Sequence, residues 1–333
     1  WDVPVQTKTF SGGLPDDRYS GLGPPIEYLS DPADPEATPP DFQIVYTPTY
    51  DGDYVNRLEG EDSLAGKKKP MIFGRVYNAT GICVNSSKSI YAFNYDKEGD
   101  RKAVYRINRV CDKGTDIIIS SDVADAAALL TSTPAAGTCI TCKAESLVIF
   151  GSIPLGDVTA DIDEAPIEQC SVPQCISRLL VSVLGYTGGV DFNQGDLDRL
   201  DALNGCPAGV YLSGDEPIKN VVVGLIGSIG GWVSPDTYGV FHFCLIDLPR
   251  IEDSVATFSN DDILDDTLNR VQFGAENRGI PPYQITIQHS TVWSVLTKGQ
   301  TLESVDEYIR TFMANEFRSA ISTDPSVRSI HQI

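Results

Sequence analysis

The feature that most constrains the fold is a change in the spacing of apolar residues near residue 165. Before it, between residues 70 and 150, short runs of β-branched and aromatic residues are interrupted by Gly, Asn, Asp and Ser. Such runs are typical of strands. The runs are MIFGRVYNA, ICVNSSKSIYAFN, AVYRINRVC, TDIIISS and TCITCKAESLVIF. We therefore predict a β-rich domain over residues 67–164, built as a small barrel or sandwich, with one short helix in DVADAAALL that begins near Asp122 or Asp125.

In the second part of the chain, apolar residues recur at helical spacing. Ser171, followed by Pro173 and Gln174, predicts the start of an amphipathic helix. Its apolar positions are Ile176, Leu179, Leu180, Val183 and Leu184. Further helices are expected in NQGDLDRLDALN, DEPIKNVVVGLIGSIGGW and SNDDIL. A C-terminal helix is expected from the apolar stripe formed by Leu302, Val305, Ile309, Phe312, Met313 and Phe317. Strands are expected in GVFHFCLID, NRVQFGAEN and YQITIQHS. Residues 165–333 are therefore predicted to form an α+β domain, which makes the whole chain an α+β protein.

Residues 1–66 have a different composition. This segment is rich in Pro, Gly, Asp and Tyr and shows no sustained strand or helix period, so we predict an extended Pro-rich arm and linker. Aromatic residues would anchor the arm along a neighbour, whereas the alternative, a disordered linker, would lack such anchors. These residues are Tyr19, Tyr28, Phe42, Tyr46 and Tyr50. Because the sequence starts at Trp1 rather than Met, we expect it to be a fragment of a longer chain.

The net charge of −21 is distributed unevenly along the chain. Residues 1–66 carry 13 acids and 3 bases, residues 67–113 carry 4 acids and 11 bases, and residues 114–333 carry 29 acids and 11 bases. A protein that binds nucleic acid gains most of its affinity from a basic surface, so we expect no stable binding to nucleic acid. No apolar run approaches the roughly 20 residues that a spanning helix needs, so no membrane span is expected.

The Cys139-x-x-Cys142 pair is the strongest candidate for a metal or redox motif. A structural zinc site needs four ligands, and Cys170 with Cys175 is only a loose match for the second pair. A redox motif is expected to open a helix, whereas TCITC has the composition of a strand. With no signal peptide visible, we expect the eight cysteines to be mostly packed thiols, or to include one local disulfide. No cofactor and no metal site are predicted.

Four acidic residues gather in one short segment, at Asp157, Asp161, Asp163 and Glu164. Paired carboxylates can bind a cation or serve in a hydrolase, but no substrate-positioning motif lies nearby, so we expect a solvated turn. The three histidines are scattered, and the sequence has no nucleophile elbow, P-loop or zinc-protease motif. No catalytic residue is predicted, and we do not expect an enzyme.

Several segments resemble, in order and spacing, the tail-tip or baseplate hub proteins of long-tailed (siphovirus-like) bacteriophages. GKKKPMIFGRVYNATGICVNSSKSIYAFN resembles a family block in which G-K-x-K-P precedes F-G-R-V-x-N and then C-V-N-x-S. GVYLSGDEPIKNVVVGLIGSIGGWVSPDTYGVFHFCLIDLP is similar to the family pattern of a helix ending in small-x-G-x-W, a turn and a strand. FSNDDILDD and MANEFRSAISTDPSVRSIH are also similar. The likeness runs from about Val3 to Ile333, with residues 17–57 as the clearest departure.

The resemblance implies a structural role in the virion. Hub proteins assemble in the host bacterial cytoplasm as a ring, commonly a trimer, which closes the tail tube and joins it to the central or receptor-binding fibre. The implied partners are further copies of the chain, the tail tube or distal tail protein, and the tail fibre or other baseplate proteins. One alternative is a host-surface adhesin or carbohydrate-binding module, suggested by the tyrosines of the arm. Another is a cell-wall hydrolase that uses Asp161, Asp163 or Glu164.

The basic block suggests how copies of an acidic protein would dock. Complementary charge steers association and fixes register, and residues 67–113 carry a net charge of +7. We therefore expect Lys67, Lys68, Lys69 and Arg75 to contact an acidic face of the adjacent subunit. The alternative is that the three lysines only solubilise a linker before the first strand.

Overall fold

The computed structural model describes residues 48–52, 58–214, 217–245, 284–323 and 325 of the 333-residue chain. The strands are β1 (Met71–Thr80), β2 (Ile82–Asn85), β3 (Ile90–Ala92), β4 (Arg106–Asp112), β5 (Thr115–Asp122), β6 (Thr138–Cys142), β7 (Leu147–Phe150), β8 (Val158–Asp163), β9 (Gly209–Leu212), β10 (Gly231–Pro235), β11 (Phe241–Leu245), β12 (Gln284–His289) and β13 (Arg318–Thr323). The helices are α1 (Ala126–Thr131), α2 (Val172–Leu184), α3 (Gln194–Leu203), α4 (Ile218–Ser228) and α5 (Glu307–Met313).

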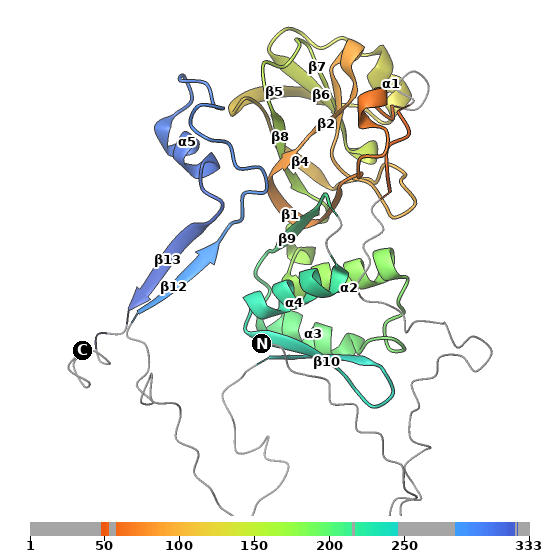
Figure 1. Ribbon diagram of the computed structural model, residues 1–333, viewed down its shortest axis with the longest axis vertical. Coiled ribbons are helices and arrows are strands. Elements are labelled where there is room, and N and C mark those ends of the chain that lie inside the picture. The colour runs from red at the N-terminus through yellow and green to blue at the C-terminus, as the bar shows by residue number, and fades with distance from the viewer. Residues whose placement is uncertain (1–47, 53–57, 215–216, 246–283, 324, 326–333) are drawn as a thin grey trace, which may run out of the picture.

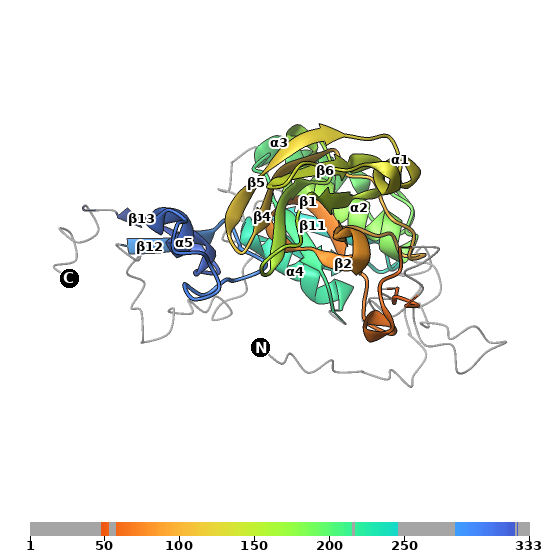
Figure 2. The same cartoon turned by 90° about the horizontal axis from the view of Figure 1, so that it is seen from above.

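Nine of these strands form one sheet in the order β2-β3-β7-β6-β5-β4-β8-β1-β9. Within it β5 and β6 run parallel, and the other neighbouring strands run antiparallel. The sheet curls into a half-barrel at the upper end of the molecule in Figure 1, and Figure 2 shows the same curl from above. The prediction of an α+β fold with a β-rich region is confirmed.

Strand β1 is buried on both faces because it lies between two hydrophobic clusters. Met71 and Phe73 pack with apolar residues of α2, α3 and α4. Ile72 and Val76 pack inside the curled sheet with residues of β4 and β8. Successive residues of a strand point to opposite faces, so a strand buried on both faces needs a nearly continuous apolar run such as MIF. β1 therefore joins the half-barrel to the helices.

Helices α2, α3 and α4 lie beneath the sheet in Figure 1, next to β1 and β9. Ser171 caps α2 by accepting a hydrogen bond from the N–H of Gln174, and Gly185 ends the helix in the left-handed conformation, with φ of 70°. The three helices predicted between residues 171 and 231 are confirmed. Beside α4, strands β10 and β11 form a two-stranded antiparallel ribbon.

The two segments that the sequence analysis separated near residue 164 share the sheet. Strand β9 pairs with β1 from Met71 opposite Leu212 to Gly74 opposite Gly209. Leu296 and Met313, from the C-terminal part, pack against Cys111 on β4. The half-barrel is therefore completed and covered by residues that follow it in the sequence.

The C-terminal helix is shorter than predicted. The side chain of Asp306 accepts a hydrogen bond from the N–H of Tyr308 and caps the start of α5. The helix begins at Glu307 and ends at Met313. The chain then becomes extended because the carbonyl of Glu316 accepts a hydrogen bond from the N–H of Val292, and β13 follows. The prediction of one helix from Leu302 to Phe317 is wrong at both ends.

Some predictions fall on residues outside the described ranges. These are SNDDIL, NRVQFGAEN and the arm up to residue 47, which includes Tyr19, Tyr28, Phe42 and Tyr46. Tyr50 is described: it is buried, and its ring lies 5.6 Å from the ring of Tyr95. At this one position the arm is anchored by an aromatic residue, and the anchor is on the chain's own half-barrel.

Candidate functional site

The acidic segment is a strand in the middle of the sheet. β8 pairs with β1 on one side and with β4 on the other. Val158, Ala160 and Ile162 face the interior of the curled sheet, so Asp161 and Asp163 point to the opposite face. The prediction of a solvated turn is wrong, because the alternating apolar residues of VTADID supply one fully buried face despite the acidic composition.

Arg75 on β1 pairs with Asp163 on β8. The guanidinium donates hydrogen bonds from Nε at 2.6 Å and from Nη2 at 2.8 Å to the two carboxylate oxygens. Burial works against the ionised form, but the hydrogen bonds from Arg75 and Asn108 outweigh it and lower the pKa of Asp163. Arg75, one of the predicted contact residues, thus has its charge matched within its own sheet.

The carboxylate of Asp161 makes fewer stabilising contacts than that of Asp163 on the same strand. Its Oδ1 accepts a hydrogen bond from the N–H of Asn78 at 2.7 Å, and its Oδ2 lies 4.0 Å from Nη1 of Arg109. Burial dominates and raises the pKa of Asp161. The two carboxyl groups of β8 therefore differ in the direction of their pKa, since only Asp163 receives a two-point contact from an arginine.

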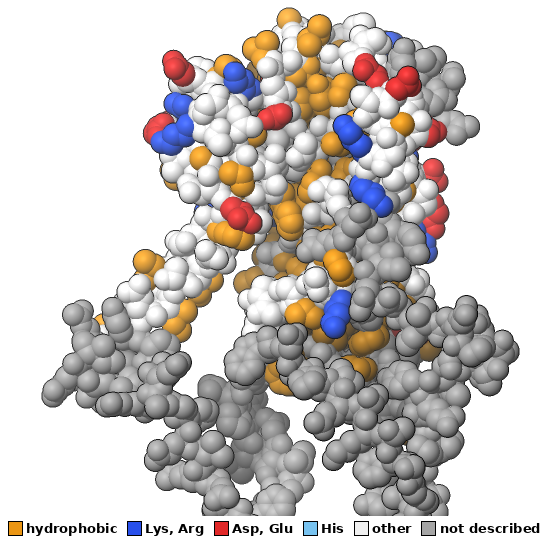
Figure 3. Space-filling view, in the orientation of Figure 1, with side chains coloured by type: hydrophobic (Ala, Val, Ile, Leu, Met, Phe, Trp, Pro, Cys, Tyr) orange, Lys and Arg blue, Asp and Glu red, His pale blue; other side chains and the backbone are white. Residues whose placement is uncertain are grey.

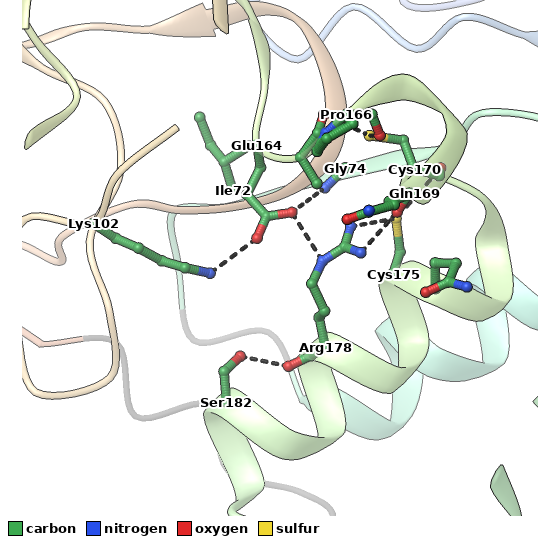
Figure 4. A network of polar contacts seen from close by, with 12 residues as sticks. Ile72, Gly74, Lys102, Glu164, Pro166, Gln169, Cys170, Cys175, Arg178 and Ser182 are labelled. Carbon is green, nitrogen blue, oxygen red and sulfur yellow. Dashed lines mark hydrogen bonds and ion pairs between the residues drawn. The ribbon is translucent and has the colours of Figure 1, made fainter. Parts of the chain in front are cut away.

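Glu164 follows β8 and lies between the sheet and α2, as Figure 4 shows. One carboxylate oxygen is 3.1 Å from Nζ of Lys102, and the other accepts hydrogen bonds from Nε of Arg178 at 3.0 Å and from the N–H of Gly74 at 3.2 Å. Arg178 also donates to the carbonyl of Gln169 at 2.7 Å. Two cations and an amide thus hold a buried carboxylate and fasten α2 to the sheet.

These contacts do not bring the predicted carboxylates together as an acid–base pair. Asp163 binds Arg75, whereas Glu164 turns toward α2 and binds Arg178. Among the residues that the structure describes, no group of three or more His, Cys, Asp and Glu side chains is arranged to hold a metal ion. The charged groups of β8 and Glu164 link strands and helix to one another.

The three lysines of the basic segment have different environments. Lys67 is exposed, Lys68 is half-buried at a bridge to Thr49, and Lys69 is only 5% exposed. The ammonium of Lys69 lies 2.7 Å from the carboxylate of Glu59 and 2.9 Å from the carbonyl of Gly99. It also lies 5.4 Å and 5.0 Å from the ring centres of Tyr50 and Tyr95.

The prediction that Lys69 contacts a neighbouring subunit is therefore wrong. Its cation binds within the chain and ties the end of the arm to the half-barrel. Consecutive lysines in an extended segment alternate in direction, so three identical residues need not share one environment. For Lys67 and Lys68, contact with a second subunit stays a prediction.

All eight cysteines are free thiols, and seven of them are at least partly buried. Cys139 and Cys142 lie on β6 but belong to different hydrophobic clusters, because residues three apart in a strand face opposite sides. Burial raises the pKa of both thiols, to about 12 for Cys139. The pair consists of packed thiols, which confirms that expectation for this motif.

A cluster around His242 was missed by the sequence analysis. On β11, Nδ1 of His242 lies 2.8 Å from the carboxylate of Asp196 on α3, and Nε2 lies 3.6 Å from Asp236. Asp196 also accepts a hydrogen bond from the N–H of Phe243 at 3.2 Å. The helix and the strand were both predicted, but Asp196 and His242 are far apart in the sequence, and no local pattern indicates their contact.

Large apolar side chains are exposed at several places on the described surface. Ile153 and Leu155 lie on the loop after β7, where the N–H groups of Leu155 and Gly156 donate to the carboxylate of Asp112. Ile285, Ile287 and Ile321 are exposed on β12 and β13. Figure 3 shows hydrophobic side chains on the upper body and along this ribbon. The surface therefore offers apolar area for contact with other molecules.

Comparison with protein-family models, curated proteins and solved structures gave no match. In the described part of the chain, none of the helices combines the length and the apolar character that crossing a bilayer requires.

Proposed function

We propose that this chain is a structural protein of a bacteriophage virion, a baseplate hub subunit at the tail tip. In this role it forms a ring, such as a homotrimer, that closes the tail tube, connects it to the central or receptor-binding fibre and helps to gate DNA passage during entry into the host cell. The observation that carries the proposal is the contrast between internally paired charges and exposed apolar side chains. A catalytic pocket needs convergent polar groups, whereas an assembly surface needs apolar area.

The segments that resemble hub proteins form central parts of the fold, which supports the proposal. GKKKPMIFGRVYN supplies β1, the strand between the two main hydrophobic clusters. The second segment supplies β9, α4 and the β10–β11 ribbon. The resemblance implies a helix, a turn and a strand in this segment, and α4 and β11 follow one another in that order, with β10 between them. Segments that build the core are expected to keep their spacing, because each change of spacing would disturb strand register.

The charge of the chain also suits the proposed position beside a DNA conduit. At −21, the protein offers few sites to which a passing phosphate backbone would bind by counterion release. Two acidic subunits meet most readily where a basic segment faces an acidic one. In the proposed ring, Lys67 and Lys68 provide such a segment.

Native mass measurement of the full chain, together with its detection in intact tail particles, tests this function. The expected result is a stable oligomer in solution and several copies per particle at the tail tip. Combined Lys67→Gln and Lys68→Gln substitutions are expected to slow assembly at low salt and to matter less at high salt. Lys219→Gln, an exposed lysine on α4, is the matched control. A chain that is monomeric within tail particles would contradict the proposal.

The alternatives remain separable by experiment. The adhesin reading depends on tyrosines of the arm, and the one in the described residues, Tyr50, is buried. Binding of the isolated chain to whole host cells would favour it. The hydrolase reading predicts clearing of cell walls by the wild-type chain that is lost in Asp161→Asn, although the carboxylates are engaged in contacts with Asn78, Arg75 and Arg178.

A further inference from the structure

The β12–β13 ribbon has no cover among the described residues. Its six antiparallel pairs run from Gln284 opposite Thr323 to His289 opposite Arg318. Every residue of β12 is exposed, and on β13 only Arg318 is half-buried. In Figures 1 and 2 the ribbon extends away from the half-barrel and the helices. Within the described part of the chain, each strand pairs only with the other, which leaves each with one open edge of N–H and C=O groups there.

The base of the ribbon is firmly attached to the body. The backbone N–H of Trp293 donates to the carbonyl of Tyr77 at 3.2 Å, and the side-chain amide of Asn78 donates to the carbonyl of Ser294. Leu296 and Met313 are buried against Cys111 of β4. The direction of the ribbon is therefore set by a packed base, where Arg318 also lies 3.8 Å from the ring centre of Phe312. Among the described residues, nothing buries the rest of its strands.

A two-stranded ribbon without a packed face is marginally stable in water. One face of this ribbon carries Ile285, Ile287 and Ala320, because directly paired residues lie on the same side of the strands. Ile321 lies on the other face. Aliphatic residues on both faces indicate that the ribbon is covered when the protein is assembled.

Charge decides which molecule can supply the cover. Two copies of a chain with a net charge of −21 repel one another, so contact between copies requires surface without carboxylates. Neither β12 nor β13 contains an Asp or Glu, and the base of the ribbon carries Arg318 and His289. The ribbon is therefore suited to approach an acidic surface, and this chain's own surface is acidic.

We propose that the β12–β13 ribbon of one copy packs on the body of a second copy of this chain. The inference rests on the proposed function, which it deepens by naming the element that links neighbouring subunits. A projecting arm that binds a different surface on the next copy makes a head-to-tail contact, and repeated head-to-tail contacts close into a ring when the rotation allows it. The aliphatic face supplies the packing, and the open strand edges supply backbone hydrogen bonds.

The test uses the full chain and combines Ile285→Lys with Ile287→Lys. Ile118→Lys is the matched control, because Ile118 is also an exposed isoleucine on a strand, 69% exposed against 55% for Ile287. Analytical ultracentrifugation should show that the ribbon variant raises the dissociation constant of the oligomer at least about tenfold, and that the control changes it less than about twofold. Unchanged thermal unfolding of both variants at low concentration confirms that the monomer fold is kept.

A second measurement places the contact directly. A photo-crosslinking amino acid at position 321 should give adducts between chains, and mass spectrometry should map them to the body of the second copy. Adducts within one chain, a wild-type chain that stays monomeric at about 100 µM, or an oligomer that survives the ribbon variant would overturn the inference. An oligomer that survives the ribbon variant overturns the inference but leaves the proposed function standing. An oligomer that depends on the ribbon but never enters tail particles would overturn the proposed function and leave the inference intact.

Discussion

The described part of the molecule contains two antiparallel ribbons with similar pairing and opposite surroundings. The β10–β11 ribbon pairs Gly231–Pro235 with Phe241–Leu245, and Phe243 is completely buried. Val233, Phe241 and Leu245 also pack on the cluster formed by α2, α3 and α4, whereas Trp232 of the same ribbon is exposed. The β12–β13 ribbon is one pair longer, yet it has no buried side chain.

This difference shows that backbone pairing alone does not explain why a ribbon is stable. Net hydrogen-bond gain in water is about 1 kcal/mol per bond, so most of the stability of a ribbon has to come from burying its side chains. For β10–β11 the cover is part of the same chain. For β12–β13 it has to be brought by another molecule or another part of the chain, and the following experiments test that distinction.

The largest expected difference is in amide hydrogen exchange. In dilute monomer, the amides of β11 should open with a free energy that approaches global unfolding, about 5 kcal/mol or more, while those of β12 and β13 should open at close to zero cost. Exchange measured by mass spectrometry or NMR checks this difference. Raising the protein concentration should slow exchange in β12 and β13. Equal protection of both ribbons in the monomer would contradict the claim that only β10–β11 is covered within its own chain.

Truncating the buried side chain of the β10–β11 ribbon should lower the free energy of unfolding by nearly as much as the difference in opening free energy between the two ribbons. Phe243→Ala removes a fully buried aromatic ring and should lower the free energy of unfolding by about 3 to 5 kcal/mol. The counterpart Ile287→Ala should change it by less than about 0.5 kcal/mol, because the side chain is already exposed. Urea denaturation of the monomer measures both values, and a large loss for Ile287→Ala would mean that the ribbon is covered within its own chain.

A smaller effect is expected from the polar link between α3 and β11. Asp196→Ala removes the acceptor for His242 and for the N–H of Phe243, which should cost about 1 to 3 kcal/mol. Asp198→Ala, an exposed residue of the same helix, should cost less than about 0.5 kcal/mol. The two variants are compared by denaturant unfolding. If they were equal, the cover of β10–β11 would depend on apolar packing alone.

The smallest expected effect is a pH dependence at the β10–β11 turn. Partial desolvation works against ionised Asp236, but hydrogen bonds from the N–H groups of Tyr238 and Val240 and from His242 outweigh it and lower its pKa. A carboxyl whose pKa is lower in the folded state stabilises the fold above its unfolded pKa, about 3.9, and loses that contribution as pH falls through the folded pKa. The stability difference between wild type and Asp236→Asn should therefore shrink as the solution is acidified. A constant difference would show that the carboxylate charge does not matter there.

Most elements of the fold were predictable because their signals are local. The apolar run of β1, the cap at Ser171 and the stripe of α2 each lie within a few residues of one another in the sequence. β8 was missed because its acidic residues outweighed an alternation of only three apolar positions. α5 was predicted too long because helical spacing continues past Met313, where pairing between Val292 and Glu316 already requires extended chain.

The contacts of the candidate site were less predictable than the fold. Lys69 was predicted to contact an adjacent subunit because it lies in the basic segment, whereas its partner Glu59 lies ten residues earlier in the same chain. Glu164 gains Lys102 and Arg178 from two different elements. Such partners are brought together by the curl of the sheet, and no spacing rule within one segment can identify them.

Gly74, in the middle of β1, limits how this protein can change over evolutionary time. Its φ is 72°, and a Cβ there would lie 2.2 Å from the carbonyl oxygen of Ala208 and 2.5 Å from Sγ of Cys175. Any other residue would push the backbone of β1 away from the segment that leads into β9 and from α2 at once. In homologous sequences, Gly74 should therefore be invariant, while the exposed Lys67 seven residues earlier is free to vary unless a neighbouring subunit selects for its charge.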